Sequence, residues 1–166
     1  MRARYLFGVS LALCLWTADR PAASPDGTCF TTASSNPPSF ALPAPYDSLP
    51  NQPQQFWYGS QALWTRLSAD GHWHGAYDAI GKTYRNKLFV WRPGYDPRTE
   101  PIPELLVTAR RLDGDAPEMS APRVTNAFAK DIGSAMLAMP AIPRSGCWEL
   151  TLRYAAESVT FVVAVQ

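Results

Sequence analysis

Charged side chains are scarce in this sequence of 166 residues, and their two signs nearly cancel. They make up 17% of the chain, against about 25% in an ordinary soluble domain. Fifteen basic and fourteen acidic residues leave a net charge of +1. Proteins that bind nucleic acid or an anionic membrane surface carry a clear basic excess. We therefore expect no nucleic-acid partner.

Histidine and the common catalytic motifs are also scarce. The chain has two histidines, His72 and His74, and no G-x-S-x-G elbow, H-E-x-x-H pattern, phosphate-binding loop or dinucleotide fingerprint. Its fourteen carboxylates show no spaced pair typical of a glycosidase. The sequence therefore predicts no catalytic residues and no cofactor, and we interpret the chain as a non-enzymatic protein.

The apolar run at the start of the chain is too short to span a membrane. It covers residues 5–18, whereas a spanning helix needs roughly 20 residues. Two arginines before it and the small residues 22–24 after it are typical of a secretory signal peptide. We predict a signal peptide over 1–24, export to the periplasm, the cell surface or the medium, and no transmembrane span in the mature chain. Leu13 stands where a lipoprotein carries a small residue before its modified cysteine, here Cys14, so we expect no lipid anchor.

Three cysteines are present, and Cys14 belongs to the predicted signal peptide. The remaining two, Cys29 and Cys147, form an even pair in an oxidising compartment, where a disulfide bond is the usual state. The bond would join the proline-rich segment around Cys29 to the strand around Cys147. The alternative is a buried free thiol at Cys147 and a mobile Cys29.

Proline, by contrast, is abundant, at sixteen residues or nearly one in ten, against an ordinary share of about 5%. Eight prolines precede residue 56, so residues 25–55 form a proline-rich arm that can run extended but cannot build a core by itself. The other eight come in pairs that separate apolar-rich stretches. Because proline cannot donate to the hydrogen-bond ladder of a sheet, the prolines fall in connections and the stretches in strands.

These stretches alternate apolar and polar residues or are rich in β-branched and aromatic ones, as strands are. The predicted strands cover residues 62–67, 71–77, 87–92, 105–110, 135–139, 147–153 and 158–165. About seven short strands broken by turn signals predict an all-β fold, an immunoglobulin-like antiparallel β-sandwich over residues 56–166. We expect Trp91 and Trp148 to be buried in its core.

The region 125–139 is ambiguous, because four apolar residues have the spacing of one helix face. They are Phe128, Ile132, Met136 and Met139. Gly133 in the middle and Pro140 at the end disfavour a long helix. We predict a strand at 135–139 preceded by a helical turn.

Four stretches resemble a group of exported bacterial proteins of uncharacterised activity that have an immunoglobulin-like β-sandwich. They are residues 58–64 (YGSQALW), 87–92 (KLFVWR), 146–151 (GCWELT) and 161–163 (FVV). Residues 137–151 are also similar to the turn that enters strand F of immunoglobulin-like domains. The resemblance covers roughly residues 56–166 and implies the sandwich fold. It implies no activity and no catalytic residues.

Asp70, His72 and His74 form the cluster that most suggests chemistry. In an extended strand, residues i, i+2 and i+4 project from one face, so a carboxylate and two imidazoles would lie together. This donor set suits zinc or copper. The alternative is a polar outer face, with Trp73 pointing to the core from the other side. Because no fourth ligand is identified and Gly71 loosens the strand, we expect no specific metal site here.

Aromatic and basic residues crowd into the first part of the predicted sandwich. They are Phe56, Trp57, Tyr58, Trp64, Trp73, Tyr77, Tyr84, Trp91 and Tyr95, with Lys82, Arg85, Lys87 and Arg92 among them. Aromatic platforms bind sugars or peptides, whereas in an ordinary sandwich core tryptophans alternate with solvated cations. Our hypothesis is an exported, non-enzymatic immunoglobulin-like domain that binds a protein or a cell-envelope glycan. The alternative is a small periplasmic metal-binding protein that uses Asp70, His72 and His74.

Overall fold

The computed structural model describes residues 28–35, 40–49, 52–121 and 123–166. The predicted signal peptide, with Cys14, and the first residues of the proline-rich arm lie outside these residues. The described residues form β-strands joined by turns, with one 3₁₀ helix of three residues, η1 (Tyr46–Ser48). The predicted all-β class is therefore confirmed. Within this part of the chain, no helix has the length and apolar character needed to cross a membrane.

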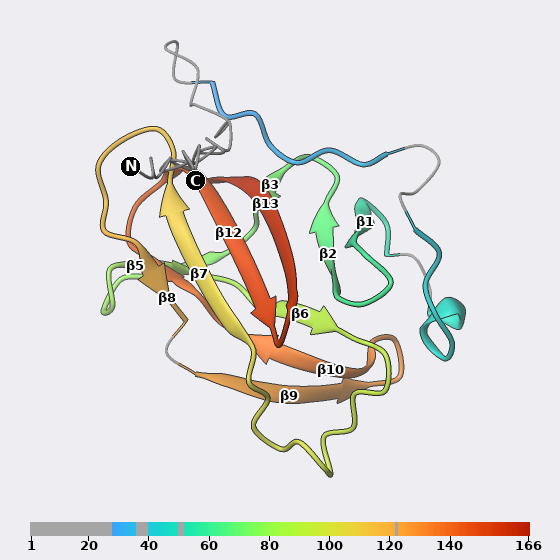
Figure 1. Cartoon of the computed structure of the whole chain (residues 1–166). Helices are drawn as coiled ribbons and strands as arrows, with labels where there is room; N and C mark the ends of the chain where they lie inside the picture. The colour runs from blue at the N-terminus through green and yellow to red at the C-terminus, as the bar shows by residue number, and fades with distance from the viewer. Residues whose placement is uncertain (1–27, 36–39, 50–51, 122) are drawn as a thin grey trace, which may run out of the picture.

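A five-stranded sheet forms one layer of the fold and has the order β1-β2-β6-β10-β9 (Figure 1). Its strands are β1 (Gln55–Gly59), β2 (Trp64–Ser68), β6 (Leu88–Trp91), β9 (Val124–Ala129) and β10 (Gly133–Ala138). All neighbours in this first sheet are antiparallel. In Figure 1, β6 runs across the line of β2, so the sheet changes direction between these two strands.

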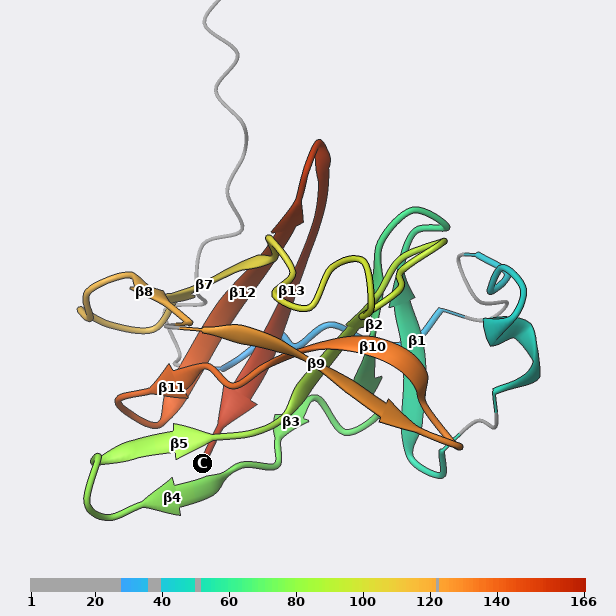
Figure 2. The same cartoon turned by 90° about the horizontal axis from the view of Figure 1, so that it is seen from below.

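A second five-stranded sheet, of order β3-β13-β12-β7-β8, forms the other layer. Its strands are β3 (His72–Trp73), β7 (Leu106–Arg111), β8 (Met119–Ser120), β12 (Gly146–Tyr154) and β13 (Glu157–Val165). The β12–β13 hairpin pairs nine residues on each strand, and the short β3 adds to it in parallel. A small third sheet at one end of the molecule contains β4 (Ala76–Asp78), β5 (Thr83–Arg85) and β11 (Ala141–Ile142) (Figure 2).

The main core lies between the two five-stranded sheets. The first sheet contributes Leu67 and Val90, and the second contributes Trp148, Leu150 and Phe161. All five are at most 6% exposed. Buried and more exposed positions alternate along β13, as expected for a strand with one face on a core. The predicted antiparallel sandwich is confirmed, whereas its immunoglobulin-like topology stays a prediction.

A second apolar cluster covers the opposite face of the first sheet. It contains Trp64 and Trp91 from the sheet and Tyr46 from the proline-rich arm, all at most 4% exposed. The indole Nε1 of Trp91 donates to the backbone oxygen of Ile132 at 2.8 Å. Trp91 is therefore buried as predicted, but on the outer face of the sheet, because its neighbour Val90 takes the inward position.

The described part of the arm is tied to the second sheet. A disulfide bond joins Cys29 to Cys147 on β12, which confirms the predicted pair. The backbone N–H of Thr32 donates to the oxygen of Val162 at 2.9 Å, and the Val162 N–H donates to Thr32 Oγ1 at 2.8 Å. Covalent and hydrogen bonds thus hold the arm along β13.

The helical turn predicted before residue 135 is wrong. Residues 124–129 form β9, which pairs with β10 over six positions, and the chain turns tightly before Gly133 at a φ of 63°. Phe128 is 77% exposed, because β9 is an edge strand with one face in solvent. The helical spacing of apolar residues was therefore coincidental.

The number of strands also differs from the prediction. The described residues contain thirteen strands, of which eight have four residues or more. The other five have only two or three residues, too few to produce a readable alternation in the sequence. Two longer strands, β1 and β9, were not among the predicted ones.

Removing the disulfide is expected to destabilise the protein strongly. In the unfolded chain the bond links residues 118 positions apart, and a loop of that order of length corresponds to about 4–5 kcal/mol in the chain-entropy model. The double variant Cys29→Ala, Cys147→Ala should lose this amount of unfolding free energy in urea denaturation. Peptide mapping without reduction should recover the linked pair from the wild type, and free thiols at both positions would contradict the structure.

Truncation of either buried tryptophan is expected to cost about 3–5 kcal/mol of unfolding free energy. Trp91 and Trp148 are both 0% exposed, so Trp91→Ala and Trp148→Ala each leave a large cavity. Phe128→Ala is the matched control, since that ring is exposed, and should change stability by less than about 0.5 kcal/mol. Equal effects at all three positions in urea denaturation would show that the strand faces are assigned incorrectly.

Candidate functional site

The structure brings together part of the predicted metal-ligand set. Asp70 Oδ2 lies 2.7 Å from Nε2 of His74, and Asp70 Oδ1 accepts the backbone N–H of His72 at 2.9 Å. This backbone hydrogen bond and the contact with His74 hold the pKa of Asp70 below its ordinary value, although partial desolvation raises it. Trp73 points to the main core, as the alternative interpretation required.

The carboxylate of Asp70 therefore closes a turn and pairs with one of the two imidazoles. The rings of His72 and His74 lie 6.2 Å apart between centroids. Among the described residues, no group of three histidine, cysteine or acidic side chains has an arrangement that holds a metal ion. The local geometry gives the metal-binding hypothesis no support beyond the sequence pattern.

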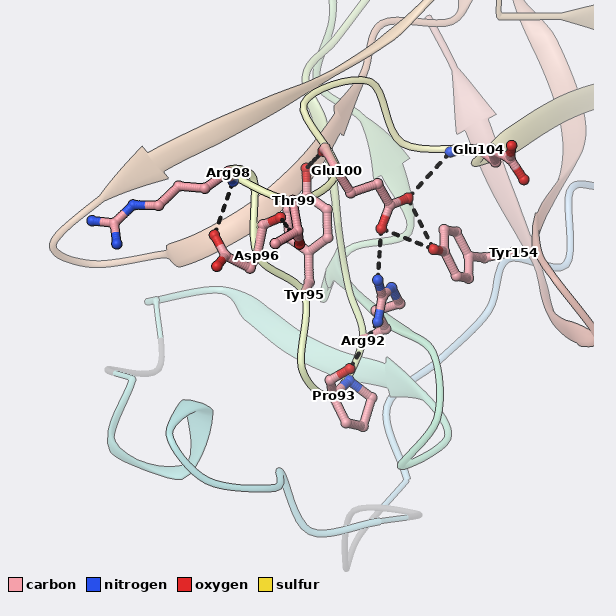
Figure 3. Close-up of polar contacts among 9 residues, drawn as sticks. All are labelled: Arg92, Pro93, Tyr95, Asp96, Arg98, Thr99, Glu100, Glu104 and Tyr154. Carbon is pink, nitrogen blue, oxygen red and sulfur yellow. Dashed lines mark hydrogen bonds and ion pairs between the residues drawn. The ribbon is translucent and has the colours of Figure 1, made fainter.

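A second polar cluster fixes the long connection between β6 and β7, and its side chains are drawn in Figure 3. Arg92 Nη2 donates to Glu100 Oε2 at 2.6 Å, and the Tyr154 hydroxyl lies 2.9 Å from both carboxylate oxygens of Glu100. The backbone N–H of Glu104 donates to Oε1 at 3.3 Å. The guanidinium carbon of Arg92 also lies 4.7 Å from the ring centroid of Tyr154.

The charges and hydrogen bonds of Arg92, Glu100 and Tyr154 stabilise one another, and we call this group the clamp. Burial alone would raise the pKa of Glu100, but the hydrogen bonds from Arg92 and Tyr154 and the charge of Arg92 bring it below its ordinary value. Burial and the nearby charge of Glu100 raise the pKa of Tyr95 to about 12. Three donors already contact the Glu100 carboxylate, namely Arg92, the Tyr154 hydroxyl and the backbone N–H of Glu104, so its oxygens are occupied within the protein.

A cavity opens where the first sheet parts between β2 and β6. These strands pair at only two positions, Trp64 with Trp91 and Thr65 with Val90. Beyond that point, residues 66–68 and 86–89 line a cavity of about 390 Å³ from two sides. Its polar lining consists mainly of amide and charged side chains: Gln52, Gln55, Arg66, Asn86, Lys87 and Asp131. The aromatic rings of Trp73 and Trp91 belong to the same lining.

Arg66 has more side-chain nitrogens without a hydrogen-bond partner than any other residue described in the lining of this cavity. Its guanidinium carbon lies 4.2 Å from the ring centroid of Trp57 and 5.6 Å from that of Trp91. Its Nε and Nη2 atoms are buried and meet no hydrogen-bond acceptor among the described residues. Burial lowers the pKa of Arg66, and the negative charge of Asp131 partly offsets this effect.

The buried side-chain atoms of the cavity that lack a hydrogen-bond partner in the described part of the chain are all donors. Of the five buried side-chain nitrogens without a partner in the described part of the chain, three belong to cavity residues: two on Arg66 and Nε1 of Trp73. The one carboxylate in the lining, that of Asp131, is exposed and accepts a hydrogen bond from Gln52 at 3.4 Å. Buried donors in native proteins almost always have a partner, so these three nitrogens, which are closed to solvent, are an unusual feature of the wall of the cavity.

Ser68, His72 and Asp131 also line the cavity, and these residue types make up hydrolase triads. A triad needs hydrogen bonds from nucleophile to base and from base to carboxylate. Within the described residues, no hydrogen bond joins Ser68 to His72 or His72 to Asp131, and Asp131 contacts Gln52 instead. The three side chains therefore do not form a hydrogen-bonded triad in this structure.

The sequence singled out neither Arg66 nor the cavity. Arg66 lies inside a correctly predicted strand, but its unmet donors depend on Trp57 from β1 and Trp91 from β6. The only available signal was the crowding of aromatic and basic residues. The structure divides that set, since Arg92 belongs to the clamp and Arg85 pairs with Asp78 at 3.4 Å.

Neutralising Glu100 is expected to destabilise the protein at neutral pH by about 1–3 kcal/mol, because a charged acceptor of several hydrogen bonds is lost. A carboxylate with a lowered pKa contributes stability above its unfolded pKa of about 4.3 and loses it as the pH falls through the folded value. The difference in unfolding free energy between wild type and Glu100→Gln should therefore shrink as the pH falls from about 5 to about 2.

Thermal and urea unfolding across this pH range measures the deficit. Glu104→Gln is the matched control, because the Glu104 side chain points away from the cluster and only its backbone takes part (Figure 3). A deficit that stays constant with pH would contradict the role given to the Glu100 carboxylate.

No protein-family model matches the chain, and neither a curated protein nor a solved structure is significantly similar to it.

Proposed function

We propose that this chain is an exported, non-enzymatic binding protein whose ligand is a saccharide of a cell-envelope glycan, held in the cavity between β2 and β6. The observation that carries the proposal is the lining of that cavity, where amide side chains, cations and tryptophan rings meet. The immunoglobulin-like form of the sandwich belongs to the same proposal and is supported by the resemblance of residues 56–166.

The size of the cavity favours a small ligand over a protein partner. A volume of about 390 Å³ falls within the range of roughly 300–1,000 Å³ typical of small-molecule pockets. A stable protein interface buries about 800 Å² on each partner and has an aromatic, apolar centre. One cavity lined by amides does not provide such a surface.

The chemistry of the lining favours a sugar among small ligands. Gln52, Gln55 and Asn86 offer both donors and acceptors, which is what hydroxyl groups need. Trp73 and Trp91 form an apolar wall behind these polar side chains and are at most 6% exposed, so the amides provide most of the contact surface. A purely apolar metabolite would leave the amides unpaired, which is costly in a partly buried site.

The Cys29–Cys147 bond supports export. Structural disulfides form and persist in oxidising compartments such as the periplasm and the extracellular space. The bond joins residues 118 positions apart, so the folded form of the chain is best maintained where it is not reduced. Envelope glycans are available to a protein in the same compartments.

Saccharide titration of the mature, disulfide-bonded protein tests the proposal. Disaccharides of glucose and of N-acetylglucosamine, and their uronic acid counterparts, are added while amide shifts and heats are recorded. We expect binding by at least one of them, with shifts concentrated at the cavity. Gln55→Ala with Asn86→Ala should weaken that binding about tenfold or more, the loss of roughly one good hydrogen bond.

Gln61→Ala is the matched control, because this exposed amide lies outside the cavity. It should leave the affinity unchanged. Absence of any shift with every saccharide would overturn the proposal. Cleavage of a saccharide that is lost in Ser68→Ala would overturn its non-enzymatic part.

A further inference from the structure

We infer that β9 is a docking strand, to which an extended acidic peptide of another protein adds as a further strand of the first sheet. None of the residues of β9 lines the saccharide cavity, so this inference does not depend on the proposed function. It starts from the free edge of β9, which borders the first sheet on the side away from β10 (Figure 1).

Two exposed residues of β9 direct their backbone hydrogen-bonding groups away from the sheet. The Ile132 N–H donates to the oxygen of Ala129 at 3.1 Å and closes the turn, so the pair Ala129–Gly133 beside it is a hydrogen-bonded one. In an antiparallel ladder such pairs alternate with pairs whose N–H and C=O groups point outward. Counted from Ala129, the outward residues include Asn126 and Phe128, both of which are exposed. No described residue forms a hydrogen bond with their outward backbone groups.

The other sheet edges in the described part of the chain are short or lie beside the arm. The edge strands β3, β4, β8 and β11 have two or three residues each. The edge strand β1 is close to the arm, since Phe40 and Leu42 line a cavity together with Phe56 and Trp57. By contrast, β9 has six residues and contains no charge, proline or bulge, which are the features that keep natural sheet edges unpaired. The edge of β9 is therefore able to accept a further strand.

Apolar side chains beside the free edge provide contacts for such a strand. Phe128 is 77% exposed and Ile102 is 63% exposed. Asn126 donates from Nδ2 to the oxygen of Pro101 at 3.0 Å, which places the β6–β7 connection, with Ile102 next to Pro101, beside β9. When a peptide adds to a sheet, the backbone supplies affinity and every second side chain contacts groups of this kind. We therefore expect apolar residues at alternate positions of the peptide.

The charges at the two ends of β9 favour an acidic peptide. Arg123 precedes the strand and Lys130 follows it, and both are exposed and form no ion pair with a described residue. The acidic residue closest in sequence is Asp131, which accepts a hydrogen bond from Gln52 at 3.4 Å. Six residues of strand span about 20 Å, so acidic side chains at both ends of the peptide would lie near the two cations. A second copy of β9 would instead bring two more cations to the same edge.

Amide hydrogen exchange of the mature, disulfide-bonded protein tests the inference. The probe is a synthetic peptide of alternating valine and threonine with aspartates at both ends, and its counterpart has lysines in place of the aspartates. We expect the acidic peptide to slow the exchange of the outward amides of Asn126 and Phe128 by about tenfold or more. The amides of Thr125 and Ala127 face β10 and should change little.

A charge variant and modified peptides separate strand pairing from non-specific attraction. The double variant Arg123→Gln, Lys130→Gln should weaken binding of the acidic peptide severalfold, and added salt should do the same with the wild type. Arg153→Gln is the control, because this exposed arginine lies on β12 in the second sheet, and it should leave binding unchanged. N-methylation of every peptide residue should abolish the protection. N-methylation of every second residue leaves one edge of the peptide able to pair and should preserve it.

Three outcomes would overturn the inference. The first is unchanged exchange at Asn126 and Phe128 with either peptide up to about 1 mM. The second is equal protection by the acidic and the basic peptide, which would exclude an acidic partner. The third is protection that rises with protein concentration without peptide, which would show that a second copy of the chain occupies the edge. These outcomes need only the wild-type protein, so they hold even if the double variant does not fold.

Discussion

The first sheet depends on a short join between β2 and β6. Only the pairs Trp64–Trp91 and Thr65–Val90 attach the β1–β2 hairpin to the rest of that sheet. Two pairs supply few backbone hydrogen bonds, so the join relies on burial of its side chains, all four of which are 0% exposed. The Thr65 hydroxyl adds a bond to the oxygen of Phe89 at 2.8 Å. The same join creates the cavity, because the sheet opens where pairing stops.

The proline-rich arm makes this join possible. An antiparallel sandwich ordinarily leaves the outer face of each sheet in solvent, where Trp64 and Trp91 would be exposed. Tyr46 from the arm covers them, with its ring centroid 5.4 Å from that of Trp64 and its hydroxyl donating to the oxygen of Ser134 at 3.1 Å. The arm builds no core alone, as expected from its composition, but it completes one. Its bond through Cys29 keeps the other end of the arm on the second sheet.

Strand positions could be predicted from the sequence where a long strand has one buried and one exposed face. The strands predicted at 87–92, 147–153 and 158–165 lie within one residue of β6, β12 and β13 at each end. Prediction was wrong before residue 135, because helical spacing implies a helix only if every apolar residue faces the core, and Phe128 does not. The cavity was beyond prediction, since the environment of Arg66 is set by strands that meet only in the folded sheet.

Placing the charged side chain of Arg66 between two tryptophans lowers the stability of the fold relative to an apolar side chain of the same length. Its aliphatic stem and cation–π contacts cover Trp57 and Trp91, and an unbranched apolar side chain would cover the same rings. Such a residue would avoid the desolvation of a charge and of two unmet donors, and replacements of this kind are often neutral or stabilising. The cation adds electrostatic attraction to that packing, because its guanidinium lies over the rings of both tryptophans. Trp57 belongs to β1 and Trp91 to β6, so Arg66 links these two strands across the short join between β2 and β6.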